Sequence, residues 1–227
     1  MDNAVVCPKF RETAINLPFY MEGDINPIKK KRTEMKIILA SASPRRKEIL
    51  ECLGVEFTVV CADADESCEL CDPCEYVMEL ARRKGIAVWN KLKNTGDLSD
   101  TVIISADTVV FAEGEILGKP RDREDAYRML KMLSGSEHSV VTGIGITADG
   151  KTTVSFCETK VEVESIPDSE IWKYIDSGDP FDKAGGYGIQ GAFSKWVKGI
   201  TGCYFNVVGL PTSALNKLFF QVTGARL

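Results

Sequence analysis

The residues best suited to bind an anion lie between positions 41 and 46, which read Ser-Ala-Ser-Pro-Arg-Arg after a short apolar run. The sequence predicts that they join a strand to a helix, so that backbone N–H groups and the helix dipole favour negative charge at one spot. Arginines in a first helical turn are unfavourable unless an anion offsets them, and a guanidinium matches phosphate oxygens with paired hydrogen bonds. The segment therefore predicts a phosphate site, with a solvated basic turn as the alternative.

A second candidate for chemistry is Asp107, which interrupts the apolar run at 101–111. An ionised aspartate in a buried strand is unfavourable unless it is paired or bound to a metal ion. Asp107 is therefore the best single candidate for a reactive carboxylate. The alternative is a residue at a strand end that caps a turn.

Other polar residues offer weaker signals. An acidic loop follows residue 61, and within it Glu66 is the best candidate to face a metal ion, unless the loop is only a solvated turn. Lys84, on a predicted helix, either lies at the surface or reaches a phosphate. Five glycines between 177 and 191 would let the backbone approach a ligand, with Lys183 and Gln190 supplying polar contacts.

Hydrophobic periodicity and turn signals predict alternating strands and helices, which place these residues. The strands are expected at 37–40, 57–61, 101–111, 140–148, 152–163 and 202–210. The helices are expected at 44–53, 73–89, 122–133, 169–175 and 212–222. The turn Asp149-Gly150 predicts a hairpin, and Glu113-Gly114 a tight turn.

Composition excludes several classes of protein. The chain has 227 residues, of which 44% are apolar, and its net charge of −5 argues against a nucleic-acid polymer as partner. No apolar run approaches the roughly 20 residues that cross a bilayer, so a membrane protein is not expected. No secretory signal is evident, and the cytoplasm is the expected compartment.

Eight cysteines and one histidine set further limits. Four of the cysteines cluster, and the favoured interpretation is reduced thiols in a loop, with a structural metal site as the alternative: Cys61, Cys68, Cys71 and Cys74. The histidine, His138, lies among serine and glutamate, so a Ser-His or Cys-His mechanism is not expected. Residues 1–34 contain three prolines and a basic run at 29–32. They predict a flexible leader before a domain at 35–227, which begins at Met35.

Five motifs together resemble the Maf family of nucleoside triphosphate pyrophosphatases, in its order and spacing over about residues 35 to 225. They are LASASPRR (39–46), SADTVV (105–110), LGKPRD (117–122), LSGSEHSVVTG (133–143) and DKAGGYGIQG (182–191). The resemblance implies an α/β fold of the inosine-triphosphatase-like type: an elongated mixed sheet flanked by helices, with two lobes around a central cleft, and a possible homodimer. It also implies cleavage of a nucleoside triphosphate to the monophosphate and pyrophosphate with a divalent cation, Mg²⁺, Mn²⁺ or Co²⁺.

The resemblance assigns roles residue by residue. Asp107 matches the proposed general base, and Glu66 and Asp107 match the acidic positions that face the metal. The remaining matches are expected to bind substrate: Ser41, Ser43, Arg45, Arg46, Lys84, Thr108, Lys119 and Gln190.

Arg45, Thr108 and Gln190 agree with the thymidine/uridine subgroup, which favours dTTP and UTP as substrates, including modified pyrimidine nucleotides. Two alternatives stay open. One is a pyrophosphatase for purine nucleotides such as inosine, xanthosine or 7-methylguanosine triphosphate. The other is a nucleotide-sensing protein that acts through a partner in cell division or septum control.

Overall fold

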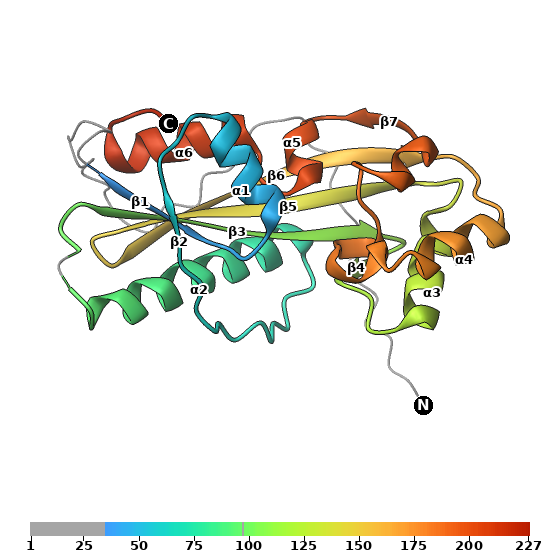
Figure 1. Cartoon of the computed structure of the whole chain (residues 1–227), viewed down its shortest axis with the longest axis horizontal. Coiled ribbons are helices and arrows are strands. Elements are labelled where there is room, and N and C mark those ends of the chain that lie inside the picture. Colours follow the sequence, from blue (N-terminus) through green and yellow to red (C-terminus); the bar gives the residue numbers. More distant parts are fainter. Residues whose placement is uncertain (1–34, 97) are drawn as a thin grey trace.

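The computed structural model describes residues 35–96 and 98–227, and the leader predicted at 1–34 lies outside them. Its centre is a seven-stranded mixed sheet in the order β2-β1-β3-β5-β6-β7, with β4 paired to β3. β1 runs parallel to β2 and β3, whereas every other pairing is antiparallel. The mixed α/β class expected from the sequence is therefore confirmed, and the molecule is elongated along its long central strands (Figure 1).

The elements follow one another along the chain as strands and helices in alternation. The strands are β1 (Lys36–Ala40), β2 (Thr58–Val59), β3 (Thr101–Ala112), β4 (Glu115–Leu117), β5 (Glu137–Ala148), β6 (Lys151–Val163) and β7 (Val197–Thr201). The α-helices are α1 (Pro44–Cys52), α2 (Pro73–Lys93), α3 (Arg123–Leu133), α4 (Asp168–Asp176), α5 (Tyr204–Val208) and α6 (Thr212–Thr223). Three short 3-10 helices lie between α4 and β7: η2 (Asp179–Asp182), η3 (Ala184–Gly186) and η4 (Ala192–Trp196).

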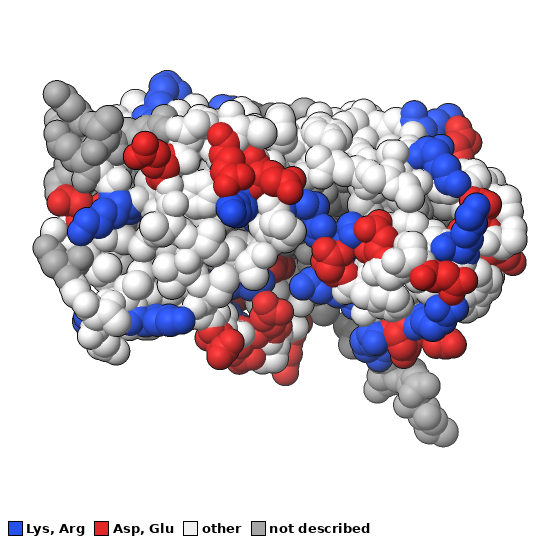
Figure 2. Space-filling model, in the orientation of Figure 1, with Lys and Arg blue, Asp and Glu red and all other residues white. Residues whose placement is uncertain are grey.

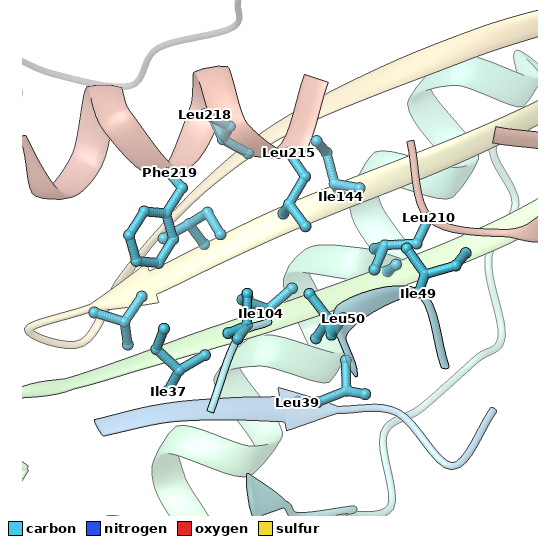
Figure 3. Packing of buried hydrophobic residues seen from close by; sticks show 14 of the residues in the cluster. Ile37, Leu39, Ile49, Leu50, Ile104, Ile144, Leu210, Leu215, Leu218 and Phe219 are labelled. Atoms are coloured by element: carbon cyan, nitrogen blue, oxygen red, sulfur yellow. The ribbon is translucent and has the colours of Figure 1, made fainter. Parts of the chain in front are cut away.

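Helices cover both faces of the sheet. On one face α1 and α6 pack against β1, β3 and β5, and Figure 3 shows Leu215 and Phe219 of α6 directed at the strands near Ile104 and Ile144. On the other face lies α2, as Figure 1 shows. A second large apolar cluster joins α3 and α4 to the far ends of β3, β5 and β6. The two large clusters thus lie toward opposite ends of the long strands.

The edge of β3 is uncovered for a short stretch between its two neighbours. Pairing with β1 ends at Ser105, and pairing with β4 begins at Val110. Residues between these two positions have a partner strand on the β5 side only. Because successive side chains of a strand point to opposite faces, this stretch presents Asp107 on the α2 face and Thr108 on the α1 face. One interruption in the pairing therefore brings side chains of both faces to the same opening.

Helix α2 lies unusually close to the sheet because the strand beneath it carries glycine. Gly143 and Gly145 of β5 face α2, and a Cβ added at Gly143 would overlap the Val77 carbonyl and lie 2.8 Å from the Met78 amide. In the helix, a Cβ added at Gly85 would meet Ser105 Oγ at 3.1 Å. Ser105 Oγ also donates a 2.7 Å hydrogen bond to Ala81 O of the helix. The close approach brings the next turn of α2 against the middle of β3.

Most predicted elements are confirmed within a few residues, and four expectations are wrong. Residues 202–210 contain helix α5 in place of the expected strand, and the last strand is β7 at 197–201. The strand expected at 57–61 is limited to Thr58–Val59. Ser43 makes no side-chain cap to α1, and Leu53, expected on the buried face, is 40% exposed. β4 was not anticipated as a separate strand, although the turn before it has positive φ at Glu113 and Gly114 as its sequence indicates.

Candidate active site

A cavity of about 550 Å³ opens where the edge of β3 is uncovered. It contains every site residue predicted from the sequence: Ser41, Ser43, Arg45, Arg46, Glu66, Lys84, Asp107, Thr108, Lys119 and Gln190. Figure 2 shows Lys and Arg side chains near a hollow in the middle of this face, with Asp and Glu beside them. The structure therefore brings together residues that lie up to 149 positions apart, from Ser41 to Gln190.

One charged group of the cavity is an ammonium held between two carboxylates. Lys84 Nζ lies 2.6 Å from Asp107 Oδ1 and 2.8 Å from Glu66 Oε1. Asp107 comes from the middle of β3, Lys84 from α2 and Glu66 from the loop that follows β2. The side chain of Asp107 is 13% exposed, whereas that of Glu66 is 64% exposed. The buried aspartate predicted from the sequence is thus paired, as its burial requires.

The charges of this cluster shift one another's protonation. Burial acts to lower the pKa of Lys84, but the charge of Asp107 and hydrogen bonds to both carboxylates leave it above its ordinary value. The hydrogen bond from Lys84 holds the pKa of Glu66 below its usual range, with smaller contributions from Lys119 and Arg46. Lys84 therefore stays protonated and Glu66 ionised near neutral pH.

Arg46 is tied into the protein by most of its donors. Its Nε donates to Gly209 O at 2.8 Å and one terminal nitrogen donates to Ser41 Oγ at 3.1 Å and to Ala106 O at 2.9 Å. The other terminal nitrogen donates to Thr108 Oγ1 at 2.9 Å. A guanidinium has five N–H groups, so these four bonds leave one for a ligand. Burial lowers the pKa of Arg46, and the nearby charge of Asp107 acts in the opposite direction.

Arg45 differs from its neighbour because it is held by an acidic side chain at the mouth of the cavity. One terminal nitrogen lies 2.9 Å from Asp182 Oδ2, and the other donates to Asp182 O at 3.4 Å. The Arg45 side chain is 25% exposed and that of Asp182 is 57% exposed. This arginine is therefore available to an anion that displaces the carboxylate.

The first motif also contributes backbone and hydroxyl groups. The Ser43 amide donates to Ser41 Oγ at 3.3 Å, which turns the chain from β1 into α1. Pro44 occupies the first position of the nine-residue helix, where its missing N–H costs nothing. The amides of the following turn lack partners within the helix, so an anion is favoured beside them. The anion-binding role expected of this turn therefore stays a prediction.

The remaining predicted residues line the walls. Thr108 Oγ1 accepts from Arg46 and lies 3.0 Å from Thr142 Oγ1, whose hydroxyl donates to Asn206 O. Lys119 and Gln190 are exposed on the walls contributed by the segment after β4 and by the glycine-rich loop. The lysine charge reaches far enough to lower the pKa of Glu66.

The acidic pair, Glu66 and Asp107, supplies the kind of ligand atom that a divalent cation takes. The point on which the two carboxylates converge is occupied by Lys84 Nζ, so a cation would have to bind beside the ammonium. Carboxylate oxygens are the ligands that Mg²⁺ prefers, and it commonly takes one or two of them together with phosphate oxygens. Across residues 35–96 and 98–227, no group of three or more His, Cys, Asp or Glu side chains could hold a metal ion by itself. This includes the clustered cysteines from Cys61 to Cys74, which are free thiols.

Sequence reasoning missed two site residues. Asp182 was not assigned a role because its partner Arg45 lies 137 residues away and no local pattern links them. Tyr76 was assigned to the apolar face of a helix but lines the cavity beside the acidic pair, where burial raises its pKa. The helical spacing of α2 indicated where Tyr76 lies, and the cluster of glycines indicated the loop that contains Asp182. Neither signal indicates which residues these two side chains contact.

In the part of the chain that the structure describes, no helix is long and apolar enough to cross a bilayer.

Comparison with known proteins gives consistent matches. A family description, Maf-like protein, matches residues 36–222. A protein of Thermoanaerobacter sp. (strain X514) named dTTP/UTP pyrophosphatase is 48% identical over 195 residues, which are 85% of this chain and 100% of that protein. A protein of Thermococcus onnurineus (strain NA1) with the same name is 46% identical over 182 residues, which are 80% of this chain and 95% of that protein.

Among solved structures, the Staphylococcus aureus Ham1 protein aligns with a TM-score of 0.41 and 14% identity, covering 83% of this chain and 91% of that one. The family match extends from the first strand to the last helix and includes every residue that lines the cavity from Ala40 to Gly209. The chain therefore belongs to the Maf family.

Proposed function

We propose that this protein hydrolyses dTTP and UTP to the monophosphate and pyrophosphate. The observation that carries the proposal is the cavity itself, which is lined by a partly buried carboxylate, Asp107, and by cationic groups from three separate segments. The names of relatives that are 46–48% identical over most of the chain support the same reaction. Agreement of Arg45, Thr108 and Gln190 with the thymidine/uridine subgroup supports the pyrimidine preference.

Asp107 is the proposed general base. A carboxylate within hydrogen-bond reach of a water molecule can take its proton as the water attacks the α-phosphorus. Lys84 orients the Asp107 carboxylate by its 2.6 Å contact, and α2 fixes the position of that ammonium. Glu66 and Asp107 are the proposed ligands of a divalent cation, Mg²⁺, Mn²⁺ or Co²⁺, which when bound would neutralise charge on the phosphate oxygens.

Cationic groups at the mouth are proposed to hold the polyphosphate. Arg45, Lys119 and the first-turn amides of α1 surround the space in front of Asp107. Charge that accumulates on the departing pyrophosphate is favoured there, and most of the acceleration in phosphoryl transfer comes from such positioning and charge stabilisation. Arg46, with four donors committed to the protein, is proposed chiefly to fix Ser41 and Thr108 in place.

A substrate panel tests the proposal directly. Pyrophosphate release would be measured with dTTP, UTP, the other common triphosphates, and inosine, xanthosine and 7-methylguanosine triphosphates, each with Mg²⁺, Mn²⁺ or Co²⁺. We expect the highest kcat/KM with dTTP and UTP. A preference for the purine analogues would replace the substrate assignment, and tight triphosphate binding without pyrophosphate release would favour a sensing protein.

The extent of the domain is a separate proposal. Residues 35–227 are proposed to form the catalytic domain, because in the part of the chain described the cavity is lined by residues from Ala40 to Gly209. The cytoplasm is the proposed compartment. A truncated chain that starts at Met35 should keep the melting temperature and turnover of the full chain. Loss of either would show that residues 1–34 contribute. Size-exclusion chromatography with light scattering would establish whether the active form is a homodimer.

A further inference from the structure

The guanidinium of Arg45 is already occupied by a carboxylate of the same chain. Asp182 Oδ2 lies 2.9 Å from one terminal nitrogen, and the Asp182 carbonyl oxygen accepts from the other at 3.4 Å. Only one terminal nitrogen holds the carboxylate, and the longer contact of the other is to a backbone carbonyl. Guanidinium N–H groups bind phosphate oxygens as they bind carboxylate oxygens, so the Asp182 side chain takes a donor that a phosphate oxygen could otherwise use.

Asp182 has a second cationic partner, which it keeps when it leaves the first. Its Oδ1 lies 2.6 Å from Lys183 Nζ, and the same ammonium lies 2.9 Å from Asp179 Oδ1. The Asp182 side chain is 57% exposed, so the oxygen released from Arg45 can be hydrated. Displacement therefore leaves no buried charge without a partner, and its free-energy cost is that of an exposed ion pair.

The backbone of the loop is anchored, so the side chain is the part that moves. The Gly185 amide donates to Gly118 O at 2.9 Å, and a Cβ added at Gly185 would lie 2.9 Å from Val110 Cβ. Gly186 is similarly close to Pro120, with 3.2 Å from an added Cβ to Cγ. Rotation of the Asp182 side chain is thus sufficient to release its carboxylate from Arg45, and only the 3.4 Å contact with the Asp182 carbonyl oxygen then remains.

We propose that Asp182 is an internal competitor for the polyphosphate group: it neutralises Arg45 in the free protein, yields to a bound polyphosphate, and returns to displace the pyrophosphate product. The inference rests on the proposed function for the identity of the product. The contact between Asp182 and Arg45 is independent of that function. Two like-charged groups cannot both occupy Arg45, so each weakens the other. Asp182 therefore limits the affinity for pyrophosphate and speeds its release.

The test is the affinity for inorganic pyrophosphate, measured by calorimetry on the full chain without nucleotide. Asp182→Asn should bind pyrophosphate roughly threefold to fivefold more tightly than the unmodified chain, the upper part of the range of an exposed ion pair. Asp182→Ser should do the same, which guards against a fold defect in one variant. The matched control is Asp179→Asn, which removes an equal charge beside Lys183 without touching Arg45 and should change the affinity less than twofold.

A double-mutant cycle isolates the Arg45 contact. In an Arg45→Ala background, Asp182→Asn should no longer tighten pyrophosphate binding. Unchanged or weaker binding by both Asp182 variants, or equal tightening with Arg45 absent, would overturn the inference. The two proposals can fail separately. If the protein cleaves no triphosphate but Asp182→Asn tightens pyrophosphate binding only when Arg45 is present, the proposed function alone is refuted. If the protein cleaves triphosphates but the tightening is absent, the role of Asp182 alone is refuted.

Discussion

Gly143 lies directly opposite Asp107 in the β3–β5 ladder, and the space that a side chain would fill at Gly143 holds the Val77 carbonyl of α2. The missing Cβ lets the helix backbone approach the strand, and two turns further along the same helix Lys84 reaches Asp107. The contact between Lys84 and the Asp107 carboxylate thus depends on the absence of a side chain across the sheet.

Gly143→Ala should unfold the protein at lower temperature and detach Lys84 from Asp107. The added methyl would overlap the Val77 carbonyl, and backbone cannot move aside as a flexible side chain can. We expect a loss of about 2 kcal/mol or more in the free energy of unfolding, measured by urea denaturation. Gly199→Ala, at a position with nothing within 4 Å, is the control and should change little. Equal stability of the two variants would contradict the close approach.

Asp107→Asn should bind dTTP and lose turnover by a factor of at least about 10², since an amide cannot accept the proton of an attacking water. Binding would be followed by calorimetry and turnover by pyrophosphate release. Asp149→Asn is the matched control, because this aspartate lies in the β5–β6 turn at φ 51°, a conformation that asparagine tolerates. Near-normal turnover of Asp107→Asn would exclude the carboxylate as base.

Lys84→Met should leave Asp107 and Glu66 facing each other without a cation, which destabilises the fold by about 2 kcal/mol at neutral pH. Adding Asp107→Asn to this variant should restore most of the loss, because one of the two charges is removed. Lys91→Met, on the exposed side of the same helix, serves as the control. Thermal unfolding of the four proteins without metal measures the effect, and an unshifted Lys84→Met would show that the acidic pair does not need the ammonium.

The two neighbouring arginines should separate into a binding and a structural role. Arg46→Ala removes donors from Ala106 O and Gly209 O, so we expect a loss of about 2–3 kcal/mol in unfolding free energy. Arg45→Ala loses only an exposed pair with Asp182 and should melt near the unmodified protein while using dTTP and UTP poorly. Melting curves and kcat/KM of both variants test this. A collapse in the melting temperature of Arg45→Ala would make it structural too.

Acid should destabilise the fold through its single histidine. His138 is 3% exposed, its Nε2 lies 2.6 Å from Tyr187 Oη, and burial lowers its pKa to about 4. Below its ordinary pKa of about 6.5 the unfolded chain binds a proton that the folded chain rejects, so stability falls as pH falls from about 6.5 toward 4. Between pH 6.5 and 5 the free energy of unfolding falls by about 2 kcal/mol, which lowers the melting temperature by about 4–8 °C. His138→Gln should flatten this slope, and an equally steep slope would assign it to other groups.

Sequence patterns predicted the fold best where local signals agree. The strand, proline and glycine around 37–54 gave β1 and α1 within two residues, and Asp149-Gly150 gave a hairpin with positive φ at both positions. Residues 202–210 failed because Tyr204, Phe205 and the two valines favour strands, while tertiary contacts decide otherwise. There the buried Asn206 side chain donates to Val140 O and Thr159 Oγ1, and Gly209 ends the short helix in a left-handed conformation.

The site was predictable in its residue types but not in its pairings. The residue types alone pointed to the Arg45–Arg46 turn and to Asp107, and the resemblance to the family supplied the rest of the ten residues that share the cavity. They did not predict the different contacts of the two arginines. Arg46 donates to the Gly209 carbonyl oxygen, whereas Arg45 is paired with the Asp182 carboxylate. Such contacts depend on how distant segments meet, which spacing along the chain does not encode.

The uncovered stretch of β3 has a consequence for how this protein can diversify. Asp107 and its acidic and basic neighbours belong to one side of the sheet, whereas Thr108, Thr142 and Arg46 belong to the other. Substitutions behind Thr108 can therefore reshape one wall of the cavity while Lys84 and Asp107, on the other side of the sheet, keep their contact. Because the two groups of side chains lie on opposite faces of the sheet, a substitution on one face can change one group without disturbing the other.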